Sequence, residues 1–342
     1  MSDRIQNIRP VTQSAEVIGK NDAELPLGGV DFAGTFVAIG NATQPFTRLL
    51  QAVADHAHLL PQPIVIQQGR TCFTDPRAQT FEFVGEVDFK RLLVQCRLFI
   101  SHAGGATVFE AIRLGKKPVV VPRRFAFAEH VDDHQVGFAN ELASQGKIHV
   151  LYDIETFPEI ITSALADASQ LPGPTNNIEA QSRIAAVLQD YASDSHDYIC
   201  LVTPSGGHLA EIRALRPIYA DRAHFFVINV PIVEPADMIG RTEYISLSQR
   251  DLKFFVNMWE AAKLFRKYRP KAILTTGGGF SVAFALVGKL FGVRTIYIET
   301  VGKVTVPTVT GRIMYFIADR FFYQWQHVAG HFPRGEYIGV VL

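Results

Sequence analysis

The segment at residues 101–105 (SHAGG) has the composition of an anion-binding turn. Apolar residues 98–100 before it are typical of a buried strand, and residues 106–114 after it have helical composition. Glycines without a Cβ let a phosphate approach the backbone, and the first N–H groups of the helix point at it. A carboxylate one helical turn into that helix could bind a ribose diol, a combination that suits a nucleotide-sugar. A tight β–α turn followed by a solvated glutamate explains the same pattern. The candidate ligands are His102, Gly104, Gly105, Ala106 and Glu110.

Residues 129–135 (EHVDDHQ) follow a predicted strand at 118–121 that delivers Arg123 and Arg124. Two histidines at i, i+4 can bind zinc, but the H-E-x-x-H order is absent and no third ligand is evident from the spacing. We therefore expect no metal here, and we expect His134 and Gln135 to read sugar hydroxyls from a helix start. The two arginines could bind a diphosphate or a sugar carboxylate through forked hydrogen bonds, with one of them expected to lie in a solvated turn.

A second set of polar groups lies in the other half of the chain, at residues 205–211 (SGGHLAE). His208 opens a predicted helix, whose positive end lowers an imidazole pKa and keeps it neutral as a proton acceptor. Glu211, on the same helical face, could orient His208 or be the base itself, and Glu299 at a strand end is a third candidate. The alternative is an N-capping turn with a structural histidine. Glycines at the two turns of this half complete the acceptor candidates, namely Gly206, Gly207, Gly278 and Gly279.

The amino-acid composition limits the kinds of protein to which these candidate residues can belong. The 342 residues are 48% hydrophobic and 19% charged, which is typical of about two globular domains. A formal net charge of +0 argues against a broad nucleic-acid surface. The three scattered cysteines do not suggest a disulfide scaffold, and the chain lacks a secretion-type apolar segment, a D-x-D triplet and a P-loop. We therefore expect a cytoplasmic protein without a tightly bound cofactor.

Strand and helix patterns alternate along both halves, which predicts an α/β fold with parallel sheets covered on both faces. Predicted strands lie at 35–39, 64–67, 81–84, 98–100, 118–121, 198–202, 225–230, 272–275 and 295–298. The polar stretch 193–197 marks a boundary. We expect an arm at residues 1–34, a donor domain at 35–192 and an acceptor domain at 193–342. Ligands of open α/β sheets bind at the carboxyl ends of strands, so two such sheets would share one cleft.

The second half resembles the membrane-recruiting acceptor subunit of the two-part transferase that adds the second sugar in lipid-linked oligosaccharide assembly. The matching residues lie at 205–211, 276–279, 297–299, 310–320 and 324–325. The first half is similar to its catalytic, donor-binding partner at residues 40–46, 101–105, Glu110 and 133–135, which adds Gly40 and Thr43 to the donor ligands. The peptidoglycan lipid II transferase family has the same motifs with the acceptor half first.

The resemblance implies a family 28-like inverting glycosyltransferase of the two-Rossmann (GT-B) architecture with the donor domain first. Residues 122–130 and the fused halves resemble the glucuronosyl-(β1→4)-glucosyl transferases of sphingan-type exopolysaccharides. The implied reaction moves glucuronic acid from UDP-glucuronate to the 4-hydroxyl of glucose on a polyprenyl diphosphate, without a metal. Alternatives are a galactosyl or N-acetylglucosaminyl transferase, a UDP-GlcNAc 2-epimerase and a non-catalytic donor-binding scaffold.

A lipid-borne acceptor implies contact with the cytoplasmic face of the plasma membrane. The predicted helix at 252–268 mixes aromatic and basic side chains, as interfacial helices do. A core-facing stripe with a solvated basic face is an equally good interpretation. The aromatic and apolar candidates are Phe254, Phe255, Met258, Trp259 and Phe265.

Overall fold

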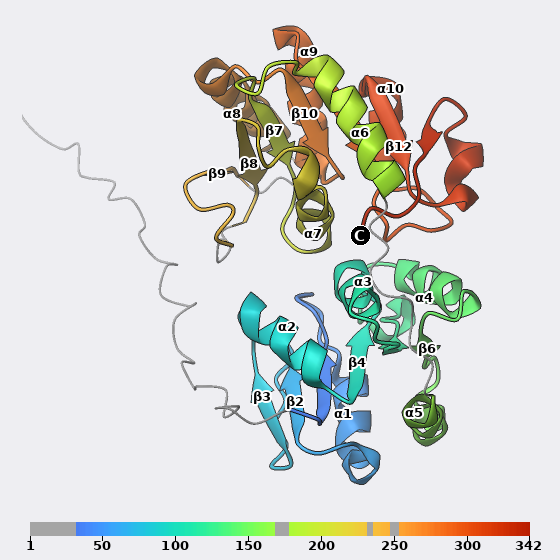
Figure 1. Ribbon diagram of the computed structural model, residues 1–342. Coiled ribbons are helices and arrows are strands. Elements are labelled where there is room, and N and C mark those ends of the chain that lie inside the picture. Colours follow the sequence, from blue (N-terminus) through green and yellow to red (C-terminus); the bar gives the residue numbers. More distant parts are fainter. Residues whose placement is uncertain (1–31, 168–177, 231–234, 247–252) are drawn as a thin grey trace, which may run out of the picture.

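The structure, a computed structural model, describes residues 32–167, 178–230, 235–246 and 253–342. These residues form two parallel β-sheets, of six and seven strands, with helices on both faces of each (Figure 1). The predicted class, two Rossmann-like α/β domains, is confirmed. Residues 1–31 of the expected N-terminal arm lie outside the described residues. Phe32, near the end of that arm, is instead 1% exposed and packs in the core of the first domain.

The first sheet has the strand order β3-β2-β1-β4-β5-β6. Its strands are β1 (Thr35–Ala38), β2 (Ile64–Gln67), β3 (Ala78–Phe81), β4 (Leu98–His102), β5 (Val119–Val121) and β6 (His149–Val150). Its helices are α1 (Thr47–Asp55), α2 (Glu86–Gln95), α3 (Gly105–Arg113), α4 (His134–Ser144) and α5 (Phe157–Ala166). Helices α1 and α5 pack on one face, while α2, α3 and α4 pack on the other.

The second sheet has the strand order β13-β12-β11-β10-β7-β8-β9. Its strands are β7 (Ile199–Val202), β8 (His224–Ile228), β9 (Thr242–Tyr244), β10 (Ala272–Thr275), β11 (Arg294–Ile298), β12 (Arg320–Tyr323) and β13 (Glu336–Tyr337). Its helices are α6 (Ile178–Tyr191), α7 (Gly207–Ala214), α8 (Lys253–Tyr268), α9 (Gly279–Phe291) and α10 (Val309–Ile317). Helices α6 and α7 cover one face, while α8, α9 and α10 cover the other.

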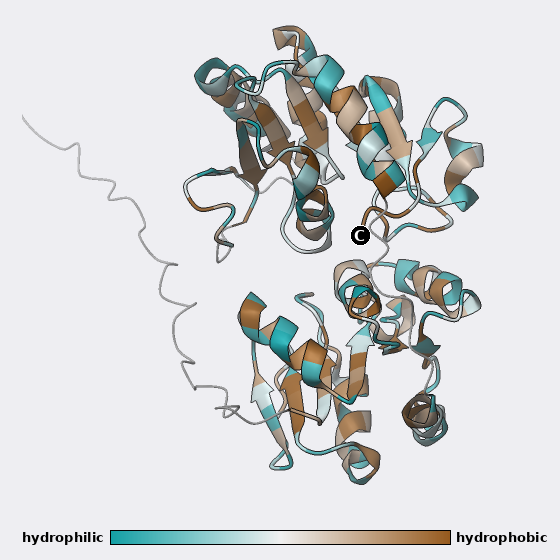
Figure 2. Ribbon diagram, in the orientation of Figure 1, coloured by the Kyte–Doolittle hydropathy of each residue, from teal (hydrophilic) through white to brown (hydrophobic). Residues whose placement is uncertain are grey.

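Continuous apolar runs explain the central strands. Every residue of β2 and of β10 is buried, as expected for parallel strands covered on both faces. In Figure 2 the central strands are largely brown, the colour of hydrophobic residues. At the sheet edges this signal fails. Strand β3 is half-exposed and polar at Gln79 and Thr80, and it lies at 78–81 rather than at the predicted 81–84. The edge strand β13 and its neighbour β12 were likewise not predicted.

Helix α6 changes the expected domain boundary. It precedes the predicted boundary at residue 193, yet its apolar residues Ala180, Ile184 and Leu188 are buried in the core of the second sheet. In Figure 1 this helix runs across the second domain. The second domain therefore includes residues from 178 onward, and residues 168–177 before them lie outside the described residues.

The two domains share an apolar cluster where α3 and α4 meet the segment after β11. Val108 and Phe138 from the first domain pack there with Val301, Val304 and Trp325 from the second. All five side chains are at most 6% exposed. The carboxyl ends of the two sheets therefore face each other. Within the described ranges, no helix has the length and apolar character needed to cross a membrane.

Candidate active site

A buried imidazole supports the Gly-rich turn between β4 and α3. A Cβ added to Gly104 would lie 2.2 Å from His102 Nε2, and one added to Gly40 would lie 2.5 Å from the same atom. Burial and the nearby Arg123 charge lower the pKa of His102 to about 3, so the ring is neutral. His102 therefore packs under the turn and supports it. Glycine is required at both positions because the ring fills the space that a Cβ would occupy.

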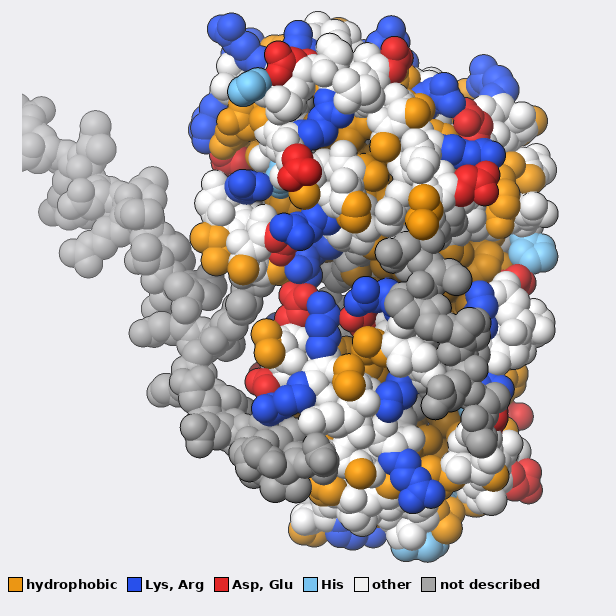
Figure 3. Space-filling view, viewed as in Figure 1, with side chains coloured by type: hydrophobic (Ala, Val, Ile, Leu, Met, Phe, Trp, Pro, Cys, Tyr) orange, Lys and Arg blue, Asp and Glu red, His pale blue; other side chains and the backbone are white. Residues whose placement is uncertain are grey.

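A cavity of about 590 Å³ lies between the domains beside this turn, a volume in the usual range for small-molecule sites. Ala106 and Glu110 line it, and Glu110 accepts hydrogen bonds from Arg113 Nε (3.0 Å) and Nη2 (2.8 Å). Figure 3 shows basic and acidic side chains gathered where the two domains meet. The charged side chains that line the cavity are Glu86, Lys90, Glu110, Arg113, Arg213, Arg216 and Asp237.

Arg213 crosses this cavity. From α7 of the second domain it reaches Glu86 Oε2 in the first domain (3.1 Å) and Asp237 Oδ1 in its own (3.0 Å). Glu86 and Arg213 were not among the predicted site residues. No local pattern marks them, because they come together only when the domains pack.

Arg123 does not have the predicted role in binding a diphosphate or sugar carboxylate. It is 1% exposed, and its guanidinium donates to the carbonyls of Ile39 (2.8 Å), Gln44 (2.8 Å) and Glu129 (3.1 Å). The ring of Phe46 lies 4.5 Å from the guanidinium carbon. Both terminal nitrogens are therefore used to join the loop after β1 to the loop after β5.

Gln135 is also turned inward. It is 4% exposed, and its Oε1 accepts from the backbone N–H of Arg123 (3.0 Å), so the amide fixes the end of β5. Arg124 is less buried, and its guanidinium carbon lies 5.5 Å from the Phe127 ring. Of the predicted pair, Arg124 is the arginine with a side chain near solvent. Thr43 is exposed and donates to Gln44 Oε1 (3.4 Å) within its own loop.

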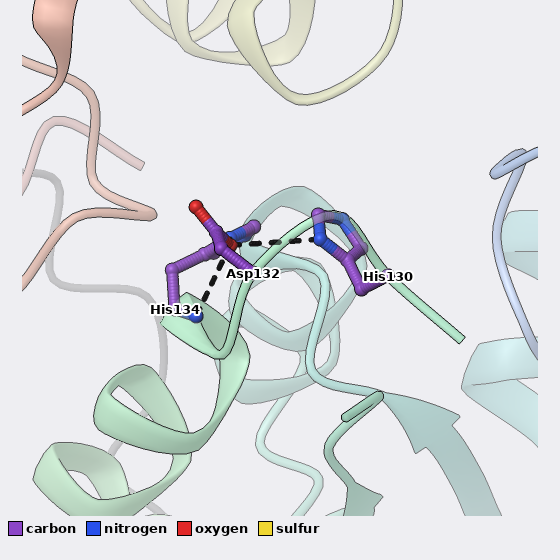
Figure 4. Close-up of side chains that lie close together, drawn as sticks. All are labelled: His130, Asp132 and His134. Carbon is purple, nitrogen blue, oxygen red and sulfur yellow. Dashed lines mark hydrogen bonds and ion pairs between the residues drawn. The ribbon is translucent and has the colours of Figure 1, made fainter. Parts of the chain in front are cut away.

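The loop before α4 and the first residue of that helix carry three side chains that point toward one another, His130, Asp132 and His134 (Figure 4). One ligand atom from each lies within 4.8 Å of the others, so Asp132 is the third potential metal ligand that the sequence spacing did not reveal. Its Oδ1 pairs with His134 Nδ1, and its Oδ2 accepts from Lys303 Nζ (2.6 Å) of the second domain. Burial alone would raise the pKa of Asp132. The hydrogen bonds from Lys303 and His134 outweigh this effect and hold the pKa well below its usual value. An ammonium group thus already neutralises the carboxylate that a metal would need.

His208 lies at the second position of α7, after the positive-φ residue Gly206. Its Nδ1 is 3.3 Å from Thr276 Oγ1, and a Cβ on Gly277 would lie 3.2 Å from its Cε1. Burial, with a smaller electrostatic effect of His134, lowers the pKa of His208 to about 4. This imidazole is neutral near pH 7 and is able to accept a proton.

The Gly-rich turns of the two domains face each other. A Cβ on Gly206 would lie 3.3 Å from Asn41 Nδ2, and one on Gly105 would lie 3.0 Å from Val301 Cγ1. Gly207 and Gly279 are exposed at the starts of α7 and α9, whose preceding strands β7 and β10 are neighbours in the sheet. Gly278 is tightly placed, because a Cβ there would lie 2.9 Å from Pro204 Cδ.

Glu211 is placed differently from a catalytic base. It is 1% exposed and accepts from Thr300 Oγ1 (2.6 Å), Val301 N (3.1 Å) and Gln324 Nε2 (2.6 Å). Burial raises its pKa to about 7 against the effect of these donors. Both oxygens are occupied, so Glu211 anchors the segment after β11.

Glu299 has a similar structural position. It is 1% exposed and accepts from Tyr297 Oη (2.8 Å) and from Thr308 N (2.7 Å) and Oγ1 (3.2 Å). A Cβ on Gly311 would lie 1.8 Å from Glu299 Oε2, so α10 packs directly on the carboxylate. The two glutamates together fix residues 299–308 within the second domain. His208 remains as the predicted base whose side chain lies at the cleft.

Comparison with known proteins finds one match in each half of the chain, and the first match extends through most of α6. Residues 35–189 match the glycosyltransferase family 28 C-terminal domain, and residues 238–341 match the family described as oligosaccharide biosynthesis protein Alg14 like. The first half of the chain is therefore similar to glycosyltransferase family 28 C-terminal domains, and the second half is similar to Alg14-like proteins. The resemblance predicted for each half is thereby confirmed at family level, whereas the finer resemblance to glucuronosyl transferases is not addressed by these matches.

Individual relatives agree with the second match. A protein named UDP-N-acetylglucosamine transferase subunit ALG14 from Yarrowia lipolytica is 27% identical over 183 residues, which cover 43% of this chain and 82% of the relative. The protein of the same name from Homo sapiens is 25% identical, covering 42% and 82%. That from Schizosaccharomyces pombe is 36% identical over 77 residues, covering 21% and 37%. Solved structures align loosely; one of GsuK bound to ADP has 12% identity, a TM-score of 0.29 and coverage of 88% and 68%.

Proposed function

We propose that this glycosyltransferase-domain protein is an inverting, UDP-sugar-dependent enzyme that glycosylates a sugar carried on a polyprenyl diphosphate. The observation that supports this most directly is the meeting of two Gly-rich strand-to-helix turns, at Gly104 and Gly206, from separate parallel sheets. One turn is built like an anion site and the other presents a neutral imidazole, His208. The donor would bind to the first domain and the lipid-borne alcohol to the second.

The reaction divides between the domains. The acceptor hydroxyl oxygen forms the new bond to the anomeric carbon while the bond from that carbon to the diphosphate oxygen breaks. His208 takes the hydroxyl proton, and UDP leaves with the electron pair of the broken bond. The N-terminus of α3 stabilises the negative charge that develops on the leaving group. Inversion requires the base and the leaving group on opposite sides of the sugar, an arrangement that two facing domains can supply.

For the finer specificity we propose glucuronic acid as the transferred sugar and the 4-hydroxyl of glucose as the acceptor. Of the two predicted arginines, Arg124 is the one left near solvent to bind a uronate, because Arg123 is held by backbone carbonyls. N-acetylglucosamine and galactose are the competing donor sugars, and the names of the Alg14 relatives favour N-acetylglucosamine. We propose that no metal is needed, because Asp132 is hydrogen-bonded to His134 as well as paired with Lys303 and is not a free ligand.

A panel of UDP-sugars with a short-chain glucosyl diphosphate lipid, analysed by mass, tests this proposal. We expect a lipid product heavier by one uronic acid residue, formed at an unchanged rate after EDTA treatment. A product from N-acetylglucosamine alone would replace the proposed donor. Donor conversion without lipid would indicate the epimerase, and UDP binding without any turnover would indicate a scaffold.

Replacing Glu110 with alanine should weaken UDP binding about tenfold, because the ribose would lose a charge-assisted hydrogen-bond partner. Isothermal titration with UDP measures this effect. Glu141→Ala is a suitable control, since that glutamate pairs with His327 on the other side of the domain contact and does not line the cavity. Equal affinity of the Glu110→Ala variant and the wild type would remove Glu110 from the ribose site.

Membrane contact is proposed for the face covered by α8 and α10. Phe255 and Trp259 are 67% and 65% exposed on α8, and Phe316 is 74% exposed on α10. Basic side chains of α8, including Lys263 and Arg266, are also exposed. Phe265 does not belong to this surface, because it is 1% exposed and lies in the domain core.

A Phe255→Ser/Trp259→Ser variant should lose most of its binding to liposomes of phosphatidylglycerol and phosphatidylcholine. The physical reason is the loss of two aromatic side chains from an interfacial surface that also carries cations. Flotation measures the bound fraction, and Val94→Ser, at an exposed apolar position of the first domain, is the matched control. A folded double variant that floats like the wild type would refute the role of this face.

A further inference from the structure

The segment at residues 301–303 of the second domain lies against the proposed donor site of the first. A Cβ on Gly105, the first residue of α3, would lie 3.0 Å from Val301 Cγ1. A Cβ on Gly302 would lie 4.0 Å from His134 Cδ2, at the first residue of α4. The next residue, Lys303, is therefore carried to a point beside the N-termini of two helices.

This segment is held rigidly. Val301 donates its N–H to Glu211 Oε2 (3.1 Å) and accepts from Trp325 Nε1 (2.7 Å). Val301 and Val304 are 2% and 3% exposed in the apolar cluster shared by the domains. Lys303 is bracketed by these two anchors, so its backbone has little freedom, while its long side chain can still move.

The charges nearby explain why a cation from the second domain matters. Departure of UDP requires positive charge at the diphosphate. Arg123 uses both terminal nitrogens on backbone carbonyls, and Arg113 pairs with Glu110 (2.8 Å). The helix N-termini supply only partial charges. Lys303 supplies a full one, with Nζ 2.6 Å from Asp132 Oδ2.

We propose that Lys303 is a catalytic residue that pairs with the diphosphate of the bound nucleotide and neutralises its charge as the sugar is transferred. This inference rests on the proposed function. The ammonium exchanges one oxygen ligand, the Asp132 carboxylate, for a phosphate oxygen. Asp132 keeps its hydrogen bonds to the side chain and backbone N–H of His134, so its charge is not left without a partner. Lys303 forms no covalent bond and accepts no proton in this step. The electron pair of the broken bond stays on UDP.

Binding of UDP and of uridine to four proteins tests the inference by isothermal titration. Lys303→Met should weaken UDP binding at least tenfold and leave uridine binding unchanged, because only UDP has the diphosphate. Asp132→Asn should bind UDP as tightly as the wild type or more tightly, since it releases the ammonium. Lys271→Met, at an exposed lysine preceding β10 at the opposite end of that strand from the cleft, is the charge-matched control.

With donor and acceptor saturating, Lys303→Met should also lower kcat about 10²–10³-fold, and Lys303→Arg should restore part of this loss. Unchanged UDP affinity in Lys303→Met overturns the inference and leaves the proposed function standing. Equal losses of UDP and uridine affinity in Lys303→Met, or a loss in Asp132→Asn as large as in Lys303→Met, also overturn it, because Lys303 would then only bridge the domains. A wild-type protein that binds no UDP overturns the inference and the proposed function together.

Discussion

Replacing His208 with alanine is expected to lower kcat about 10²–10⁴-fold while leaving UDP affinity unchanged. The imidazole is the predicted base whose side chain lies at the cleft, and the nucleotide is bound by the other domain. Steady-state kinetics with saturating donor and acceptor, together with UDP titration, separate the two effects.

The pH profile adds a readout that a structural role would not change. Because burial lowers the pKa of His208 to about 4, the imidazole stays deprotonated down to that pH. The acid limb of kcat/KM should therefore fall near pH 4 rather than near the ordinary histidine value of about 6.5, and it should vanish in the variant.

Glu211→Gln serves as the comparison for His208→Ala. This substitution should reduce the free energy of unfolding. The new amide N–H₂ would face N–H and hydroxyl groups that now donate hydrogen bonds to the carboxylate. At temperatures where it is folded it should keep the acid limb near pH 4. Full activity of His208→Ala with loss of activity only in Glu211→Gln would transfer the role of base to the glutamate.

Gly104→Ala is expected to weaken UDP binding about 100-fold and to destabilise the first domain by about 1–3 kcal/mol. Its Cβ would lie 2.2 Å from His102 Nε2, and the ring has no room to retreat because Gly40 approaches the same atom. The turn that would cradle the diphosphate must therefore move. UDP titration and chemical denaturation measure the two effects.

Two further variants identify the cause in Gly104→Ala. Adding His102→Ala should recover part of the affinity, because the smaller side chain makes room for the new Cβ. Gly137→Ala, in the interior of α4, should be neutral or slightly stabilising, since its Cβ would meet only Thr305 Oγ1 at 3.8 Å. Wild-type UDP affinity in the single variant Gly104→Ala would contradict the proposed phosphate site.

Local patterns were sufficient for much of the fold. Short apolar runs followed by glycine predicted the central strands, and the runs at 64–67 and 272–275 coincide with β2 and β10. They failed at the edge strand β3, which is only partly buried and carries polar residues such as Gln79. They also missed β12, a four-residue strand that begins with Arg320. The boundary near residue 193 was misplaced for α6, because the pattern of an amphipathic helix does not indicate which sheet it covers.

The amino-acid sequence by itself determined two Rossmann-like halves, the Gly-rich turns at their strand ends and a histidine at the start of α7, since each depends on neighbouring residues. Only the tertiary structure decided what the charged side chains do. Arg123 is bound by a carbonyl 84 residues away, and Glu211 by a hydroxyl 89 residues away. A buried arginine and a ligand-binding one have the same local sequence, and so do an anchoring glutamate and a catalytic one. The pairing of Lys303 with Asp132 spans 171 residues, so no local pattern contains it.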